Sequence, residues 1–440
     1  MLLLSYKILL SVPDEDPKAI TKPDPFAALR FKEFRSYLAM RFFLTFAYQM
    51  QAVIVGYHIY QLTKSALALG MIGLTEAIPS IGIALYGGYV ADKSEKKRLL
   101  LMIFSVMWIC SAIMLLVTLP VASRYFSSNH IIVTLYVMIF FIGLARGFYG
   151  PTAFSVMTRI IPRELYPNSS TWNSSAYQTA SVLGPLAGGL IFDRLGISIT
   201  FSFVVVFITT AMIAIITLNR HEAEFVPKES IYKSLSEGIS FVFGNRMLLG
   251  ALSLDLFSVF FGGAVALLPI FANDILKVGA QGFGLMRAAD SVGAVLTMLA
   301  MTRFSPMGKP WRNLLVAVTG FGISIICFGF SKNFYLSLFC LFMLGAFDSV
   351  SVLIRSTIMQ LLTPDQMRGR VSAVNSMFIG SSNEIGAFES GVTARLMGTV
   401  TSVIFGGSMT LVVVITTFLK TKKLVPMQLN EINAPEVAKV

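Results

Sequence analysis

Two long apolar runs of this sequence are joined by the short polar segment GYVADKSEKKR, residues 88–98. The segment holds two acids, Asp92 and Glu95, and four cations, Lys93, Lys96, Lys97 and Arg98. Short loops rich in Lys and Arg between apolar spans lie on the cytoplasmic side of a membrane. The segment therefore predicts a cytoplasmic turn between two membrane-spanning helices.

The composition extends this prediction to the whole chain. Of the 440 residues, 55% are apolar and only 13% are charged, and the mean hydropathy is +0.73. A soluble domain carries nearer ~25% charged residues. The sequence thus predicts an all-α, multi-pass membrane protein surrounded by the lipid bilayer. The net charge of +12 comes from cations in the loops between apolar runs, so it indicates topology rather than nucleic-acid binding.

Twelve apolar runs can be delimited, and a charged segment divides them six and six. They cover approximately residues 37–61, 68–91, 99–119, 131–157, 169–195, 198–218, 247–272, 282–303, 313–330, 335–359, 371–395 and 398–419. We expect a cytoplasmic extension at 1–36, a first six-helix bundle at 37–218 and a second at 247–420. A cytoplasmic linker with an amphipathic helix is expected at 219–246, and a cytoplasmic tail at 421–440.

The two halves repeat each other in order. Gly73 corresponds to Gly284, an offset of 284 − 73 = 211, and the stretch around Asn173 corresponds to that around Asn375, an offset of 375 − 173 = 202. Both matches keep the same direction through the membrane. Two parallel bundles related by an axis along the membrane normal are expected from such a repeat.

At this point the sequence resembles the major facilitator superfamily. Gly88, Asp92, Lys93, Lys96 and Lys97 are similar to its signature loop, which implies a cytoplasmic gate that holds the two bundles together. Gly184, Pro185, Gly188 and Gly189 resemble the signature of its exporters. The runs 254–269, 285–289 and 368–384 are similar to the enterobactin-exporter-like branch of secretion transporters. The resemblance implies twelve helices in two pseudo-symmetric bundles, alternating access and a bacterial inner membrane location.

Charged residues inside the apolar runs are the candidates for function. A charge at the centre of a lipid-facing helix costs at least ~2.5–3.5 kcal/mol, so such residues face a cavity or a partner. The candidates for proton coupling are Asp348, Glu384, Asp255 and Arg146. Arg146 and Asp348 are related by the second repeat offset, and we expect them to pair across a central cavity. Asp255 has no neutralising neighbour in the sequence.

Two further groups of residues are expected at the cavity. Glu76, Arg287 and Asp290 are candidates for an outer gate, because Glu76 and Arg287 correspond in the repeat. Gln49, Tyr48, Tyr177, Gln178 and Asn383 are candidates for the substrate pocket. For each ion pair, a static structural tie is the competing interpretation.

These observations predict a monomeric secondary transporter. It would export a small amphipathic organic molecule, siderophore- or drug-like, against inward proton flow, with both termini cytoplasmic. A translocator of lysophospholipid or another lipid with the same fold is the alternative. The chain has only three scattered histidines, three cysteines inside apolar runs and no phosphate-binding loop, so we expect neither an enzyme, a metal site nor a cofactor.

Overall fold

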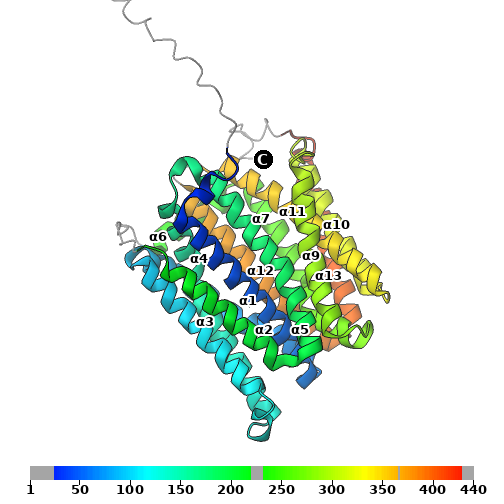
Figure 1. Cartoon of the computed structure of the whole chain (residues 1–440). Coiled ribbons are helices and arrows are strands. Elements are labelled where there is room, and N and C mark those ends of the chain that lie inside the picture. Colours follow the sequence, from blue (N-terminus) through cyan, green and yellow to red (C-terminus); the bar gives the residue numbers. More distant parts are fainter. Residues whose placement is uncertain (1–23, 220–230, 365–366, 429–440) are drawn as a thin grey trace, which may run out of the picture.

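Long helices cross the molecule from end to end in a tilted bundle (Figure 1). The computed structural model describes residues 24–219, 231–364 and 367–428, and these contain no strand. The helices are α1 (Lys32–Thr63), α2 (Ala66–Lys93), α3 (Lys96–Thr118), α4 (Ser128–Ile160), α5 (Tyr166–Ile216), α6 (Ile231–Gly244), α7 (Arg246–Phe261), α8 (Leu268–Ile270), α9 (Gly279–Met301), α10 (Pro310–Phe330), α11 (Phe334–Leu362), α12 (Arg368–Met397) and α13 (Thr399–Lys420).

Ten helical segments among the described residues are long and apolar enough to cross a membrane. One of them lies in α5, whose 51 residues contain a sharp bend at Gly196, with φ 80° and ψ 175°. Glycine suits this bend because a positive φ costs it no clash with a side chain. The bend lies between the predicted runs 169–195 and 198–218. α12 has 30 residues but is less apolar and is not among the ten, so the count of twelve spans stays a prediction.

Several helix starts follow from short polar residues at the predicted turns. The side chains of Ser65, Asn245 and Asn333 accept hydrogen bonds from the backbone N–H groups of Ala68, Leu248 and Leu336, respectively. The first N–H groups of a helix have no partner within the helix, and such capping satisfies them. These residues set where α2, α7 and α11 begin.

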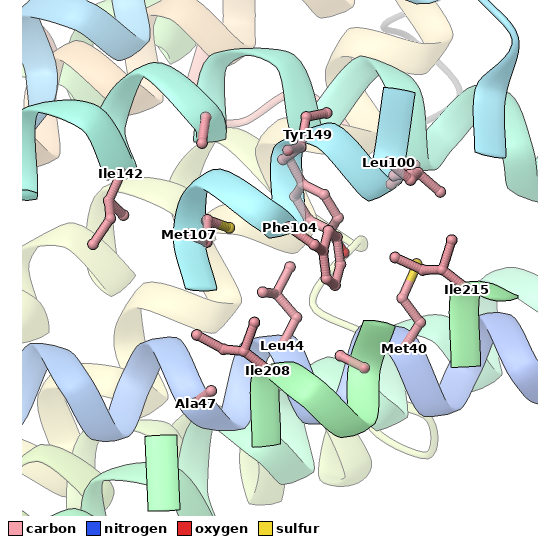
Figure 2. Close-up of a cluster of buried hydrophobic side chains, with 14 of the residues drawn as sticks. Met40, Leu44, Ala47, Leu100, Phe104, Met107, Ile142, Tyr149, Ile208 and Ile215 are labelled. Atoms are coloured by element: carbon pink, nitrogen blue, oxygen red, sulfur yellow. The ribbon is translucent and has the colours of Figure 1, made fainter. Parts of the chain in front are cut away.

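We call α1–α5 the first half and α7–α13 the second half. The core of the first half is apolar and draws on α1, α3, α4 and α5, as Figure 2 shows for Leu44, Phe104, Ile142 and Ile208. All four side chains are at most 4% exposed. This packing fixes the helices that carry the polar residues of the site.

Close contacts between glycines bring the two halves together. A Cβ on Gly391 of α12 would lie 2.7 Å from the Cα atom of Gly70 in α2. A second pair joins α5 and α9, where a Cβ on Gly189 would lie 2.9 Å from the Cα atom of Gly284. Any side chain at these positions would push the helices apart. The two halves thus meet at two glycine contacts, α2 with α12 and α5 with α9.

Further contacts close the same end of the molecule, where α1 ends. Tyr57 donates a hydrogen bond to Asn273 Oδ1 at 3.2 Å, and Tyr60 donates one to Asp274. Both acceptors belong to a π-helical turn, Phe271–Ile275, that follows α8. We call this the closed end. The dark-blue start of α1 lies at the opposite end, toward which α13 also runs (Figure 1).

Candidate functional site

A cavity of about 350 Å³ lies between the two halves, below the closed end. Its walls come from α1 and α2 of the first half and from α7, α9, α10, α11 and α12 of the second. Aromatic rings of Phe283 and Phe321 face it alongside Tyr48. Its charged lining residues are Glu76, Arg287, Asp290, Asp348 and Glu384. Acids thus outnumber cations in the lining of this central cavity by four to one.

Arg146 of α4 connects the two halves beside this cavity. Its Nη1 atom forms an ion pair with Glu76 of α2 and lies 3.4 Å from Oε1 of Glu384 in α12. The same nitrogen donates a hydrogen bond to the Tyr48 hydroxyl at 2.8 Å, and this hydroxyl donates to Glu76 Oε1 at 2.7 Å. Four helices therefore meet at one guanidinium group.

The burial of this cluster differs among its members. The side chain of Glu76 is 9% exposed, that of Glu384 is 23% exposed, and that of Arg146 is 36% exposed. A charge removed from water needs a partner of opposite charge and hydrogen bonds to compensate its lost hydration. Glu76 has both from Arg146 and Tyr48. Glu384 has the longer contact, so it is the carboxylate that can leave Arg146 at the smaller cost.

Asp348 of α11 and Asp290 of α9 line the second half's side of the cavity. α9 and α11 approach closely here, because a Cβ on Gly345 of α11 would lie only 2.7 Å from Oδ1 of Asp290. No ion pair to Asp348 is present in the described parts of the chain. The expected pair between Arg146 and Asp348 is therefore not formed, because Arg146 is held by Glu76 and Glu384.

The candidates for an outer gate also line the cavity. Glu76, Arg287 and Asp290 are all present in its wall, but Glu76 pairs with Arg146 of its own half rather than with Arg287. The contacts that close the nearby end involve Tyr57 and Tyr60 instead. A gating role for these three charged residues stays a prediction.

Asp255 lies away from the cavity, in an ion pair with Arg355 of α11. The two side chains are 8% and 5% exposed. No neutralising neighbour was evident from the sequence because Arg355 follows Asp255 by 100 positions. An arginine inside the apolar stretch of α11 was the available signal, since a charge within a span implies a partner.

The helix that begins with α7 is interrupted where it borders the cavity. Gly262 and Gly263 line the cavity, and a 3₁₀ turn, Gly263–Leu267, separates α7 from α8. A Cβ on Gly263 would lie 2.7 Å from the Gly386 oxygen of α12. Interrupted helices are tolerated at membrane depth where they are buried in protein or line a cavity.

The predicted pocket residues divide into two sets. Tyr48 and Asn383 line the cavity, whereas Gln49, Tyr177 and Gln178 do not. Gln49 donates to Ser181 Oγ at 3.3 Å, between α1 and α5. The Tyr177 ring instead contacts the Arg41 guanidinium group, 5.2 Å from the ring centre.

The glycines of the exporter signature pack helices. A Cβ on Gly184 would lie 2.9 Å from Cβ of Gln49, and one on Gly188 would lie 3.1 Å from the Met50 side chain. Gly189 faces α9, and the Pro185 oxygen would lie 2.5 Å from a Cβ on Gly284. The signature therefore packs α5 against α1 on one side and against the second half on the other.

The cations of the signature loop contact the ends of helices. Lys97 Nζ donates to the backbone oxygens of Ile216 and Leu218, at 2.6 and 2.7 Å, where α5 ends. Buried Lys96 donates to the Ala91 oxygen. Lys93 lies over the Tyr89 ring, 4.5 Å from its centre. These contacts stay within the first half, so a gate formed with the second half by Gly88, Asp92 and the cations remains a prediction.

Two helical halves that surround a charged central cavity define the class of fold to which the chain belongs. Solved structures share this fold. The chain aligns over 88% of its length with all of a mutant of the nucleoside transporter NupG, with a TM-score of 0.71 and 11% identity. It aligns over 90% of its length with all of a D-xylose-proton symporter, with a TM-score of 0.69 and 12% identity. The fold is that of the major facilitator superfamily.

Sequence comparison narrows the class to a family. Residues 23–439 match the family described as transmembrane secretion effector. The chain is also similar to enterobactin exporter EntS of Shigella flexneri, with 24% identity over 84% of this chain and 87% of the relative. EntS of Escherichia coli O81 (strain ED1a) gives the same identity and coverage. The protein belongs to the transmembrane secretion effector family of major facilitator transporters. It is thus a membrane transporter and not an enzyme.

Proposed function

We propose that this protein is a proton-coupled exporter of a small amphipathic organic molecule, siderophore- or drug-like, that works by alternating access. The ion pair between Arg146 and Glu384 carries this proposal, because it joins the two halves beside the central cavity. A contact across the boundary of the halves must break when they rock apart. Protonation of Glu384 would remove its negative charge and favour that step.

The lining of the cavity fits the proposed substrate. Phe283 and Phe321 offer apolar and aromatic surface, and Asn383 and Tyr48 offer hydrogen-bonding groups. Such a combination is typical of sites for small organic ligands. The similarity of the chain to enterobactin exporters supports outward transport of a secreted compound.

Asp348 and Glu384 are the better candidates for the coupling acid among the four predicted residues. Both line the cavity, where a proton and a substrate can reach them in turn. Asp255 is neutralised by Arg355 away from the cavity, and we assign it a structural role. We place the protein in the bacterial inner membrane as a monomer with both termini in the cytoplasm.

The alternative function is translocation of a lysophospholipid or another lipid. A second, apolar cavity of about 380 Å³ between α1, α5 and α9 favours it, with walls that include Phe46, Leu186 and Leu285. This cavity lies at the junction of the two halves, where an acyl chain could enter from the bilayer.

Export from everted membrane vesicles tests the proposal. Catechol siderophores, cationic dyes and lysophospholipids would be offered with and without an imposed proton gradient. We expect a siderophore or dye to accumulate only with the gradient. Movement of lysophospholipid alone, independent of the gradient, would contradict the proposal and support the lipid translocator.

A further inference from the structure

A large groove lies at the end of the molecule opposite the closed end, between the start of α7 and the end of α13. Its volume is about 1050 Å³, larger than that of the central cavity. It is separate from the central cavity, with which it shares no lining residue. We call it the basic groove.

Four cations line the basic groove. Arg246 is the first residue of α7, Lys420 is the last residue of α13, and Lys422 and Lys423 follow in a 3₁₀ turn. No acidic side chain lines the groove within the described residues. The backbone N–H groups at the start of α7 add partial positive charge beside Arg246. The groove is therefore a concentrated positive site.

The lysine-bearing segment is held in place. Thr421 Oγ1 accepts a hydrogen bond from Trp311 Nε1 at 2.9 Å, and the Leu424 side chain between α7 and α10 is only 4% exposed. Trp311 is itself fully buried. Because both neighbours are anchored, the backbone that carries Lys422 and Lys423 is held at the groove, and the two exposed side chains start from its rim.

Below the cations, the walls of the basic groove are mainly apolar, with the hydroxyl side chains of Ser253, Thr416, Thr417 and Thr421 among them. Leu249 and Phe257 of α7 and Leu419 of α13 line it, and Phe257 is 47% exposed. α7 and α13 both lie in segments that are long and apolar enough to span the membrane, so these walls run from the cationic rim toward the bilayer interior. A charged rim above an apolar wall matches a molecule with an anionic head and a long apolar chain.

We propose that the basic groove binds one anionic phospholipid of the surrounding membrane. The phosphate would lie among Lys420, Lys422 and Lys423, and an acyl chain would lie along Leu249 and Phe257. Basic pockets between membrane helices hold anionic lipid headgroups in this way. The excess of Lys and Arg in cytoplasmic loops explains why several cations lie at this end of the molecule. It does not explain why they converge on one groove with mainly apolar walls.

Lipid binding to the purified full-length protein tests this proposal. The protein in detergent would be titrated with phosphatidylglycerol or with phosphatidylcholine of the same acyl chains, and bound lipid would be counted by native mass spectrometry. We expect preferential binding of phosphatidylglycerol. The triple variant Lys420→Gln, Lys422→Gln, Lys423→Gln should bind it about 100-fold more weakly, since each lysine near the lipid contributes about fivefold.

A matched control removes three other cations from the same end of the molecule. Arg303, Lys309 and Arg312 are exposed, lie between α9 and α10 or at the start of α10, and do not line the groove. The variant Arg303→Gln, Lys309→Gln, Arg312→Gln should keep the wild-type affinity for phosphatidylglycerol. An equal loss in both triple variants would overturn the proposal, because it would indicate diffuse surface charge.

The apolar wall provides an independent measurement. Phe257→Ser should weaken phosphatidylglycerol binding while the groove keeps all its cations. Inorganic phosphate at millimolar concentration should not displace the bound lipid. Displacement by inorganic phosphate, with no effect of Phe257→Ser, would identify a site for free phosphate and overturn the proposal.

Discussion

Arg146 Nη1 and Glu384 Oε1 lie 3.4 Å apart, although 238 positions separate the two residues in the sequence. This contact joins α4 of the first half to α12 of the second half. On the first half's side, Arg146 is also held by Glu76 and Tyr48. The cluster can therefore lose its connection to Glu384 and still keep the arginine neutralised.

Replacement of Glu384 by Gln should uncouple transport from the proton gradient. Glutamine keeps the size of the side chain but cannot carry the charge or exchange the proton. Because Glu76 still neutralises Arg146, we expect the variant to fold and to exchange substrate across the membrane without a gradient. Gradient-driven accumulation in everted vesicles should fall at least about 100-fold, a loss equivalent to about 2.7 kcal/mol.

Glu76→Gln is the informative comparison for Glu384→Gln. It removes the principal partner of Arg146, whose charge would then have only the longer contact to Glu384. We therefore expect the Glu76→Gln protein to be less stable than the Glu384→Gln protein. Thermal unfolding of the two variants, purified in detergent, would measure this difference. Wild-type accumulation by Glu384→Gln under a gradient would show that this carboxylate does not couple.

Asp348→Asn should abolish gradient-driven transport while substrate binding survives. The carboxylate lines the cavity and has no ion-pair partner in the described residues, so its loss leaves no cation uncompensated. Binding of a fluorescent substrate and its accumulation in vesicles would be measured side by side. Accumulation at the wild-type rate would exclude Asp348 as the coupling site and leave Glu384.

The pair of Asp255 and Arg355 should stabilise the second half without taking part in transport. Each side chain is nearly inaccessible to solvent, and removal of one partner from a buried ion pair costs about 3–5 kcal/mol. We expect Asp255→Leu and Arg355→Met each to lower the thermal stability of the purified protein strongly. The double variant should recover most of it, because no charge is then left unpaired.

Transport by the double variant decides between the two roles of Asp255. Gradient-dependent accumulation by Asp255→Leu with Arg355→Met would confirm the structural role. If the double variant is as stable as the wild type but cannot use the gradient, Asp255 is the coupling acid after all.

The sequence predicted those features of the protein that local patterns determine. Apolar runs and loop cations predicted the membrane helices, and the repeat glycines predicted a relationship between the halves. Tyr48, Glu76, Asp348 and Glu384 were singled out because a polar group inside a span needs a cavity or a partner. All four line the central cavity.

The identity of each partner could not be read from the sequence. Arg146 was expected to pair with Asp348 because the two correspond in the repeat, but it pairs with Glu76 and Glu384. Arg355 was missed as the partner of Asp255. Such pairs depend on the rotation of each helix about its axis, which the packing of neighbouring helices sets. The same unknown rotation explains a second error. Gln49, Tyr177 and Gln178 were expected in the pocket, but they lie outside its lining.

Gly391→Val should prevent the closed end from closing. A Cβ at this position would lie 2.7 Å from the Cα atom of Gly70 and 2.9 Å from the Ala66 oxygen, both in the first half. Neither atom can move without a shift of α2, so α2 and α12 must separate. We expect loss of transport together with a cavity that stays open toward the end where α1 terminates.

Labelling of a cysteine in the cavity would measure this opening. Ala387 lines the cavity, and Ala387→Cys would serve as the reporter in a background with Cys110, Cys327 and Cys340 replaced by Ala. A membrane-impermeant thiol reagent, added from the side of the closed end, should label the reporter faster once Gly391→Val is introduced. Gly380→Val is the matched control, since a Cβ there meets no atom within 4 Å. Equal labelling rates in the two valine variants would mean that the glycine contact does not close this end.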